Sequence, residues 1–270
     1  MSDSSNFLFG HITKSDQGIF CFPKDEDGIG KSLLSNGTWA NKELSSLKKI
    51  VHDDDNILIL GAHIGTLAIP ISLDCNQVYA IEANPDIYKF LKANIFLNDR
   101  NNIDSYMIAA SDTAGTIDFI SVSGNTGGSK IYPKLLHPHY LNDIKNIYKI
   151  QKISIDELLP EIKVRIIFID IEGSEYFALK GMKNCLENSE VLFIEYIPYH
   201  LEFVAGITPE EFSNELEKYF NILYIPGLDI YVEKNNFKNI LRYMYDKKHS
   251  EDQIVFAKEI SQIANLGNIL

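Results

Sequence analysis

Two apolar segments joined by a glycine turn constrain the fold of this chain more than any other feature. The first segment, residues 56–60, runs into Gly61 and Gly65, and the second, residues 78–81, ends on Glu82. In a doubly wound sheet this order holds a nucleoside cofactor, because the glycines let it approach the backbone and the carboxylate accepts hydrogen bonds from ribose hydroxyls. The pattern therefore predicts an α/β fold and a class of cofactor, although it does not specify a reaction.

Strand-like and helix-like segments alternate along most of the chain. The expected strands are residues 57–60, 77–81, 105–109, 116–122, 148–154, 164–170, 190–196, two short strands around Pro226, and 253–257. The expected helices are residues 64–73, 85–97, a short one after Asp156, 174–186, 209–219 and 237–245. This alternation predicts a single doubly wound, mostly parallel, Rossmann-like sheet that binds ligands at the carboxyl ends of its strands.

The chain is expected to divide into an N-terminal arm and one cofactor-binding domain. Residues 1–50 lack strong periodicity until residues 41–50, where apolar positions three apart fit one face of a helix. This arm could pack on the core or on a partner subunit of a homo-oligomer. Residues 51–270 form the expected domain, with a glycine-rich, polar insertion near residues 123–147, and such insertions are usually functional or mobile.

Composition and charge argue against several partners. A net charge of −12 disfavours nucleic acid and anionic membrane surfaces, because both bind through basic patches. The three cysteines have neither a CxxC motif nor metal-ligand spacing, which is typical of a reducing compartment. The longest apolar run, residues 57–73, contains two glycines, His63 and Pro70, so it indicates a buried strand and helix and no membrane span. A cytoplasmic protein is expected.

The spacing of the glycines indicates which cofactor binds. A dinucleotide site needs G-x-G-x-x-G so that pyrophosphate can reach the helix N-terminus, but His63 occupies the position of the middle glycine. The glycines alone could merely shape a tight turn. The acid at the end of the next strand, however, favours a cofactor without phosphates, and S-adenosylmethionine (SAM) is therefore expected in preference to NAD. The residues assigned to SAM are Gly61, Ala62, His63, Ile64, Gly65, Glu82, Ala83 and Asn84, together with Ala110 and Ser111 after the third expected strand.

A second block places three acids at a strand-to-helix junction. Residues 166–169 form an apolar strand that ends on Asp170, and Glu172 and Glu175 follow. Acids near a helix N-terminus are stabilised by the helix dipole by about 0.3–1 kcal/mol each, and such capping accounts for Glu175. It does not account for Asp170, which follows a buried strand. Asp170 is therefore predicted to face the ligand.

Together the two blocks resemble the FkbM-type family of SAM-dependent methyltransferases. Residues 59–65 match the family's first motif, Asp-Val-Gly-Ala-Asn-Ile-Gly, at four positions. Residues 82–85 match its second motif, an acid followed by a Pro-Asn-Pro-like turn. Its Leu-x-x-Asn corresponds to residues 91–94, and its Lys-Ile-Asp-Val-Glu-Gly-x-Glu block to residues 168–175. The resemblance spans roughly residues 36–200. It implies a seven-stranded sheet, SAM as cofactor, and O-methylation of sugars or polyketide-like natural products.

Three departures from the family pattern bear on cofactor binding. Ile59 stands where the family has the first-strand acid, His63 where it has Asn, and Phe168 where it has Lys. The first-strand acid of this superfamily helps to orient the methionine end of SAM, so the alternative is a SAM-binding or interaction module with impaired catalysis. His63 could compensate for the missing acid. So could Glu43, which lies in a stretch that resembles the family's region before the first motif.

O-methylation requires a residue that takes the proton of the acceptor hydroxyl during in-line methyl transfer. The candidate bases are Asp170, Glu172, Glu195 and His200, and Asp170 is preferred because its strand end should point at the cofactor's methyl group. Asp170 with Glu172 or Glu195 could instead hold a divalent cation, but two acids are too few to predict a metal site. Lys130, in the glycine-rich insertion, could close over a small-molecule or glycan acceptor, the alternative being a solvated lysine in a mobile loop.

Overall fold

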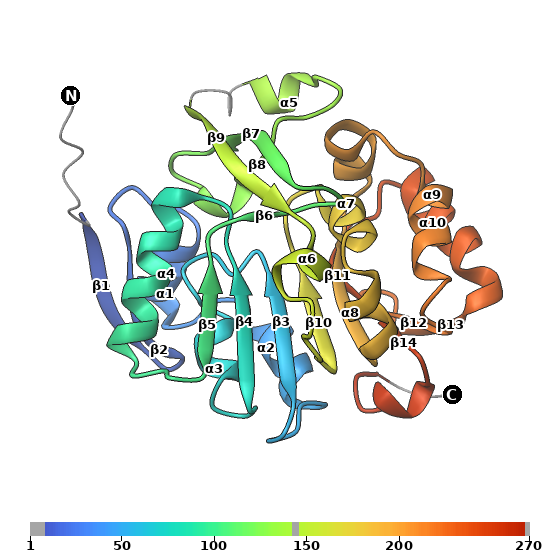
Figure 1. The fold of residues 1–270 in the computed structure, drawn as a ribbon, viewed down its shortest axis with the longest axis horizontal. Coiled ribbons are helices and arrows are strands. Elements are labelled where there is room, and N and C mark those ends of the chain that lie inside the picture. Colours follow the sequence, from blue (N-terminus) through green and yellow to red (C-terminus); the bar gives the residue numbers. More distant parts are fainter. Residues whose placement is uncertain (1–8, 142–145, 268–270) are drawn as a thin grey trace.

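The computed structural model describes residues 9–141 and 146–267 and contains a main sheet of eight strands (Figure 1). Their order across the sheet is β13-β12-β14-β11-β10-β3-β4-β5. The bounds are β3 (Asn56–Leu60), β4 (Gln77–Ile81), β5 (Ile103–Tyr106), β10 (Ile166–Ile169), β11 (Val191–Tyr196), β12 (Ile222–Ile225), β13 (Ile230–Glu233) and β14 (Glu251–Ala257).

The predicted α/β fold with a mostly parallel sheet is confirmed, but the expectation of seven strands is wrong. The four pairs that join β11, β10, β3, β4 and β5 are parallel. The remaining three pairs, β11 with β14, β14 with β12, and β12 with β13, are antiparallel. The eighth strand is β13, because the chain turns back after β12 and pairs with it at the edge of the sheet.

Helices cover both faces of the main sheet, as a doubly wound fold requires. One face packs on α1 (Ile29–Asn36), α2 (Asn41–Lys48), α3 (Ala68–Ile71) and α4 (Pro85–Leu97). The other packs on α6 (Ile155–Leu158), α7 (Glu175–Lys180), α8 (Lys183–Asn188), α9 (Pro209–Leu216) and α10 (Phe237–Asp246). Ile57 and Ile59 of β3 join the first core and Leu58 and Leu60 the second, because successive side chains of a strand point to opposite faces.

The N-terminal arm contains more structure than its sequence predicts; its residues 1–8 lie outside the described residues. A hairpin of β1 (Gly10–Ser15) and β2 (Gly18–Pro23) precedes α1, and Phe20 of β2 is fully buried in the core. Asn94 of α4 and Asn98, which follows the helix, hold this hairpin through hydrogen bonds to the backbone of β2. The hairpin was not predicted because these partners lie 73 and 79 residues away along the chain, so no local pattern reveals them.

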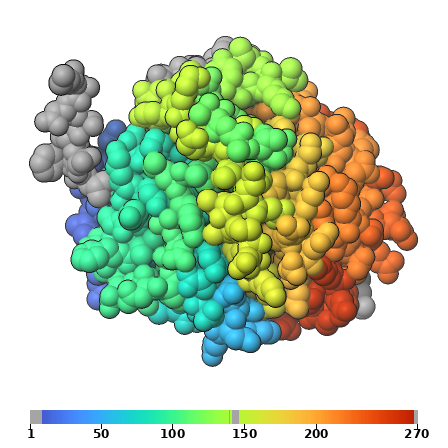
Figure 2. Space-filling model, in the orientation of Figure 1, coloured from blue at the N-terminus to red at the C-terminus, as the bar shows by residue number. Residues whose placement is uncertain are grey.

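The glycine-rich insertion belongs to a second, four-stranded sheet that lies above the carboxyl ends of β3, β4 and β5 (Figure 1). Its order is β6 (Ala109–Ala110), β9 (Asn146–Ile153), β7 (Gly115–Ser121) and β8 (Lys130–Ile131), and the segment also contains α5 (Pro138–Leu141). We call this sheet, with the 3₁₀ turn Thr126–Gly128, the roof. Its atoms cover the top of the molecule in Figure 2. Residues 142–145 of the expected insertion lie outside the described residues.

Two predicted helices differ from the structure. The helix expected at residues 64–73 is reduced to α3, because residues 64–67 complete the glycine turn and Pro70 has no N–H to donate. The helix expected at residues 174–186 divides into α7 and α8 at Gly181, where a Cβ atom would lie 1.9 Å from the carbonyl oxygen of Ser111. Within the described part of the chain, none of the helices has the length and apolar character needed to cross a bilayer.

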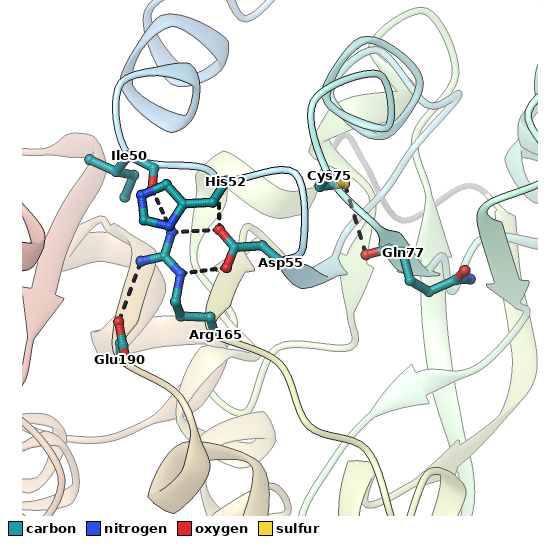
Figure 3. Close-up of polar contacts among 7 residues, drawn as sticks. All are labelled: Ile50, His52, Asp55, Cys75, Gln77, Arg165 and Glu190. Carbon is teal, nitrogen blue, oxygen red and sulfur yellow. Dashed lines mark hydrogen bonds and ion pairs between the residues drawn. The ribbon is translucent and has the colours of Figure 1, made fainter.

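The amino edge of the sheet is closed by a buried ion pair (Figure 3). The Asp55 carboxylate is 6% exposed and accepts hydrogen bonds from Arg165 Nε at 2.6 Å and from the backbone N–H of His52 at 2.7 Å. Arg165 also donates to the carbonyl oxygen of Ile50 and lies 3.4 Å from Glu190. A guanidinium that holds a carboxylate through two nitrogens is both strong and directional, so this pair fixes the starts of β3 and β10 together.

Candidate cofactor and active site

A cavity of about 640 Å³ lies at the carboxyl edge of the main sheet, beneath the roof. Its walls come from residues 39–43, the glycine turn, the roof, and the ends of β4, β10 and β11. The chain runs from β3 outward to β4 on one side and to β10 on the other, so the strand order reverses at β3. Doubly wound sheets bind ligands at such a reversal, and the cavity occupies the position that the sequence predicts.

Gly61 allows the backbones of β3 and β10 to approach each other at the cavity wall. The N–H groups of Gly61 and Ala62 both donate to the carbonyl oxygen of Ile81 at 2.9 Å. Gly61 has φ +87°, and a Cβ atom there would lie 1.7 Å from the carbonyl oxygen of Asp170. The turn therefore requires glycine, and it brings the first motif into contact with the second block.

Ile64 and Gly65 shape the turn from behind and are not among the residues that line the cavity. The Ile64 side chain is fully buried, and its carbonyl oxygen accepts a hydrogen bond from Asn94 Nδ2 at 2.8 Å. A Cβ atom on Gly65 would lie 2.9 Å from Ile69 and 3.0 Å from Leu91. The asparagine of the family's Leu-x-x-Asn motif thus supports the backbone of the glycine turn.

Glu82 sits at the end of β4, where its carboxylate lines the cavity. One oxygen accepts the backbone N–H of His63 at 2.8 Å and the other accepts that of Asn84 at 2.7 Å. Burial raises the pKa of Glu82 to about 7, even though these hydrogen bonds oppose the rise. The acid is held rigidly, in the position predicted for the acceptor of ribose hydroxyls.

Some of the other predicted cofactor residues line the cavity, and the rest lie behind its wall. Ala83, Ala110 and Glu43 line the cavity with Ala62. Asn84 lies behind the wall, where Nδ2 is 3.1 Å from Ser121 Oγ and 3.3 Å from Ser129 Oγ in the roof. The N–H of Ser111 donates to the carbonyl oxygen of Ile153 at 3.0 Å, so Ser111 joins β6 to β9 and does not reach the cavity lining.

His63 links the glycine turn to the roof and to the arm. Its backbone has φ +50°, and its Nε2 lies 2.8 Å from Thr126 Oγ1. Thr126 Oγ1 in turn donates to the Glu26 carboxylate, which also accepts the backbone N–H of Gly28 at 3.1 Å. Burial lowers the pKa of His63 to about 4, so the imidazole is neutral near pH 7. The Nδ1 atom is buried and has no hydrogen-bond partner among the described residues.

The opposite end of the cavity gathers the carboxylates of the second block. Asp170, at the end of β10, lines the cavity with Glu172 and Glu195. Burial and the nearby Glu175 carboxylate raise the pKa of Asp170 to about 7. The Glu175 carboxylate accepts the backbone N–H groups of Ile171 and Gly173 at 3.1 Å, so it holds the turn that precedes α7.

His200 lies between Glu195 and Glu172 and is not among the cavity-lining residues. Its Nδ1 is 3.1 Å from Glu195 Oε2, and its Nε2 is 3.4 Å from Glu172 Oε2. Burial and mutual repulsion raise the pKa of Glu172 well above its usual range, and burial with repulsion from Asp170 does the same for Glu195. Glu172, Glu195 and His200 each offer one atom that could bind a metal, and these atoms lie within 4.8 Å of one another. The contacts of His200 with the two glutamates account for this arrangement without an ion.

Lys130 is a buried residue of the roof and does not line the cavity. It is 4% exposed, its Nζ donates to the carbonyl oxygen of Gly128, and it lies 5.2 Å from the centre of the Tyr140 ring. The alternative of a solvated lysine is therefore wrong. Lys130 lies close enough to Glu172 and Glu195 to affect their pKa values. Its positive charge lowers both pKa values, although burial raises them more.

Ile59 and Phe168 depart from the family pattern together. They are direct neighbours in the parallel pairing of β3 with β10, and both are buried in the same core. The family's acid and lysine would occupy these two adjacent positions, so here an apolar pair replaces a pair of opposite charges. Such a replacement is often neutral or stabilising when both partners change. The two departures from the family pattern therefore lie side by side on neighbouring strands.

The sequence analysis missed three residues of the site. Asp252 lines the cavity because β14 is antiparallel to β11, which brings its amino end to the carboxyl edge of the sheet. No local pattern signals this. Thr126 lies in the glycine-rich insertion, whose composition indicated function without indicating which residue acts. Glu26 belongs to an acidic turn of the arm whose sequence resembles any exposed turn.

Comparisons with known proteins identify the family of this chain. The model of the methyltransferase FkbM domain matches residues 60–251. The hexuronic acid methyltransferase AglP of Haloferax volcanii is 28% identical over 172 residues, which cover 62% of this chain and 63% of that protein. An uncharacterized protein of Methanocaldococcus jannaschii is 37% identical over 60 residues, or 22% of this chain and 23% of that protein. The chain thus spans less than two thirds of the length of these curated relatives.

Two solved structures are similar at lower identity. The FkbM methyltransferase of Methylobacillus flagellatus is 16% identical with a TM-score of 0.41, and the match covers 76% of this chain and 44% of that one. The TYW2 protein of Methanocaldococcus jannaschii, in complex with AdoMet, is 15% identical with a TM-score of 0.43, covering 93% and 88%. The domain match is the decisive finding, because it spans more than half of the chain and includes both blocks of the site. The chain belongs to the methyltransferase FkbM domain family.

Proposed function

We propose that this chain is a SAM-dependent O-methyltransferase that methylates a hydroxyl group of a sugar, glycan or small metabolite. The observation that carries the proposal is a single cavity that joins Glu82 and the glycine turn to Asp170 and its neighbouring carboxylates. Methyl transfer is an in-line displacement that depends mainly on positioning, so donor and acceptor must share one enclosed space. A cavity of about 640 Å³ lies within the usual range for small-molecule sites.

The residues of the cavity fit SAM. Glu82 offers carboxylate oxygens for ribose hydroxyls, and Gly61 leaves the backbone open to close approach. When bound, SAM supplies a methyl group on a positively charged sulfonium. The carboxylates of Asp170 and Glu43 line the same cavity and favour a cation there.

Asp170 is the proposed general base. It accepts the proton of the acceptor hydroxyl while the new oxygen–carbon bond forms and the bond from the methyl carbon to the donor's sulfur breaks. Its pKa of about 7 suits proton transfer near neutral pH, since the best base has a pKa close to the working pH. His200 acts indirectly, by holding the side chains of Glu195 and Glu172 at the cavity wall.

Two measurements test this function. Calorimetry with SAM is expected to show binding, and transfer of a labelled methyl group to a panel of sugars and glycans is expected to give a base-stable ether product. The cofactor bound without transfer to any acceptor would favour the alternative, a module with impaired catalysis. Binding of NAD in place of SAM would overturn the proposal.

A further inference from the structure

The 3₁₀ turn of the roof is tied to the residues on both sides of Glu82. His63 and Asn84 hold the two oxygens of the Glu82 carboxylate through their backbone N–H groups. His63 Nε2 lies 2.8 Å from Thr126 Oγ1, at the start of the turn. Asn84 Nδ2 lies 3.3 Å from the Oγ of Ser129, the residue after the turn. The turn and Glu82 both line the cavity, so a ligand that Glu82 binds lies beneath the turn.

Two glycines of this turn are not required by the protein around them. Neither Gly127 nor Gly128 has a positive φ, whereas Gly124, just before the turn, has φ +82°. A Cβ atom on Gly127 would lie 3.6 Å from Ile29, and one on Gly128 would lie 3.4 Å from Asn125, which are ordinary contacts. Ile29 and Asn125 also line the cavity, so the space that these side chains would fill belongs to the cavity. Close approach of a ligand to the backbone accounts for glycine at both positions.

A chain of hydrogen bonds holds the turn against the N-terminal arm. The buried Glu26 carboxylate accepts the hydroxyl of Thr126 and also its backbone N–H, the latter at 3.0 Å. Beside it, the N–H of Asp27 donates to the carbonyl oxygen of Gly124 at 2.7 Å. Because the hydroxyl proton of Thr126 goes to Glu26, its oxygen accepts the N–H of His63. One hydroxyl therefore joins the arm, the roof and the glycine turn.

We propose that this turn is a strap that closes over the nucleoside part of SAM and that the Thr126 hydroxyl is its latch to Glu26, an inference that rests on the SAM-dependent function proposed above. The backbone of Gly127 and Gly128 contacts the nucleoside from above, while Glu82 binds it from below. The demethylated product, S-adenosylhomocysteine, leaves when the latch opens. Opening of such elements limits product release in many enzymes.

Substitution of the two glycines separates contact with the cofactor from support of the fold. In Gly127→Ala and in Gly128→Ala, the Kd for SAM measured by calorimetry should rise by about tenfold, because the added methyl group occupies the cofactor's space. The thermal unfolding midpoint without ligand should stay the same or rise, because alanine fits the empty turn and restricts the unfolded chain. Thr116→Val, at an exposed position of β7, is the control and should change neither quantity.

The latch is tested through the rate of product release. Trp39 is the single tryptophan of the chain and lines the cavity, so its fluorescence reports on occupancy. Displacement of S-adenosylhomocysteine, followed by stopped-flow fluorescence, should be about tenfold faster in Thr126→Val than in the wild type, because the latch hydroxyl is lost. Thr126→Ser keeps the hydroxyl and should restore slow release. If the fluorescence does not respond to the ligand, retention of radiolabelled S-adenosylhomocysteine on a filter gives the same rates.

Three outcomes overturn the strap and leave the SAM-dependent function standing. Glycine variants that bind SAM as tightly as the wild type would show that the cofactor does not reach the turn. Weaker binding together with a lowered unfolding midpoint would give the glycines a structural role only. Release that is equally slow in Thr126→Val would show that the hydroxyl is not a latch. A wild-type protein that binds neither SAM nor S-adenosylhomocysteine would instead overturn the function, and the strap with it.

Discussion

The two ends of the cavity hold their acids in opposite ways. At one end, Glu82 is isolated from other carboxylates and is fixed by the backbone N–H groups of His63 and Asn84. At the other end, Asp170, Glu172 and Glu195 repel one another, and His200 contacts Glu172 and Glu195. An acid fixed by backbone donors is suited to binding a ligand in one position. Burial raises the pKa of the acids at both ends, and repulsion between carboxylates adds to this rise only at the crowded end. Acids that hold protons near neutral pH there are suited to proton transfer.

The largest expected effect is at the crowded end. Asp170→Asn removes the proposed base, so kcat should fall by about 100- to 10,000-fold, whereas the loss of one carboxylate near the sulfonium should raise the Kd for SAM by no more than about tenfold. Single-turnover methyl transfer and calorimetry measure the two quantities separately. Asp118→Asn serves as a control because this carboxylate lies on the exposed side of the roof. A loss of SAM affinity equal to the loss of rate would show that the two ends are not separate.

The apolar pair Ile59 and Phe168 provides a test of stability. Ile59→Asp places a charge in the core without a partner, which should lower the free energy of unfolding by about 3–5 kcal/mol. Adding Phe168→Lys on the neighbouring strand should restore part of this loss, because the two positions are adjacent in register. Denaturant unfolding of the two single variants and the double variant completes the cycle. Additive losses would contradict the interpretation that the two departures are coupled.

A smaller effect is expected at the isolated end. Glu82→Gln keeps the size of the side chain but removes the charged acceptor, so the Kd for SAM should rise by about 10- to 100-fold. The kcat at saturating SAM should stay close to that of the wild type. Asp86→Asn, an exposed acid in the first turn of α4, is the matched control. A fall in kcat without a change in Kd would place Glu82 in the chemical step.

The smallest effect concerns pH. Glu82 and Asp170 both have pKa values raised to about 7, so the cavity gains negative charge between pH 6 and pH 8. The sulfonium of SAM is positively charged, so the Kd for SAM should fall by about tenfold over this range. The sulfur of S-adenosylhomocysteine is uncharged, so the Kd for that ligand should change less. His63 does not contribute, because its pKa is about 4. Calorimetry at three pH values compares the ligands, and identical pH dependences would contradict the expectation.

The same pKa values predict how stability without ligand depends on pH. A raised pKa means that the folded protein binds protons that the unfolded chain has released, so the free energy of unfolding should fall as the pH rises from about 4 to 7. Above about pH 7 both states are deprotonated at Glu82 and Asp170, and this contribution stops changing. Denaturant unfolding between pH 5 and pH 8 measures it.

The sequence predicted those parts of the site that depend on short segments. Gly61, Glu82 and Asp170 each follow an apolar strand, and parallel strands necessarily bring their carboxyl ends to one edge. The strand β4 and the helix α4 match the predicted bounds, because their apolar periodicity is complete within the segment.

What the sequence could not supply depends on pairing between distant segments. Asp252 reaches the cavity only because β14 runs antiparallel to its neighbours. Thr126 contacts His63, 63 residues away, and Glu26, 100 residues away, and neither distance leaves a periodic signal. Both short strands around Pro226 were predicted, but the pairing that makes β13 the eighth strand at the edge of the main sheet was not.

The ion pair at the amino edge has a consequence for the order in which the chain can fold. Arg165 lies 110 residues after Asp55, so the glycine turn and Glu82, which line the cavity, are synthesised before the partner of that buried acid. A fragment that ends before residue 165 would bury a carboxylate without a counter-charge and would lack the strand beside β3. The glycine turn and Glu82 therefore do not form a unit that folds alone. A nascent chain acquires its cofactor site only after β10 has emerged, and contacts of such long range make that step slow.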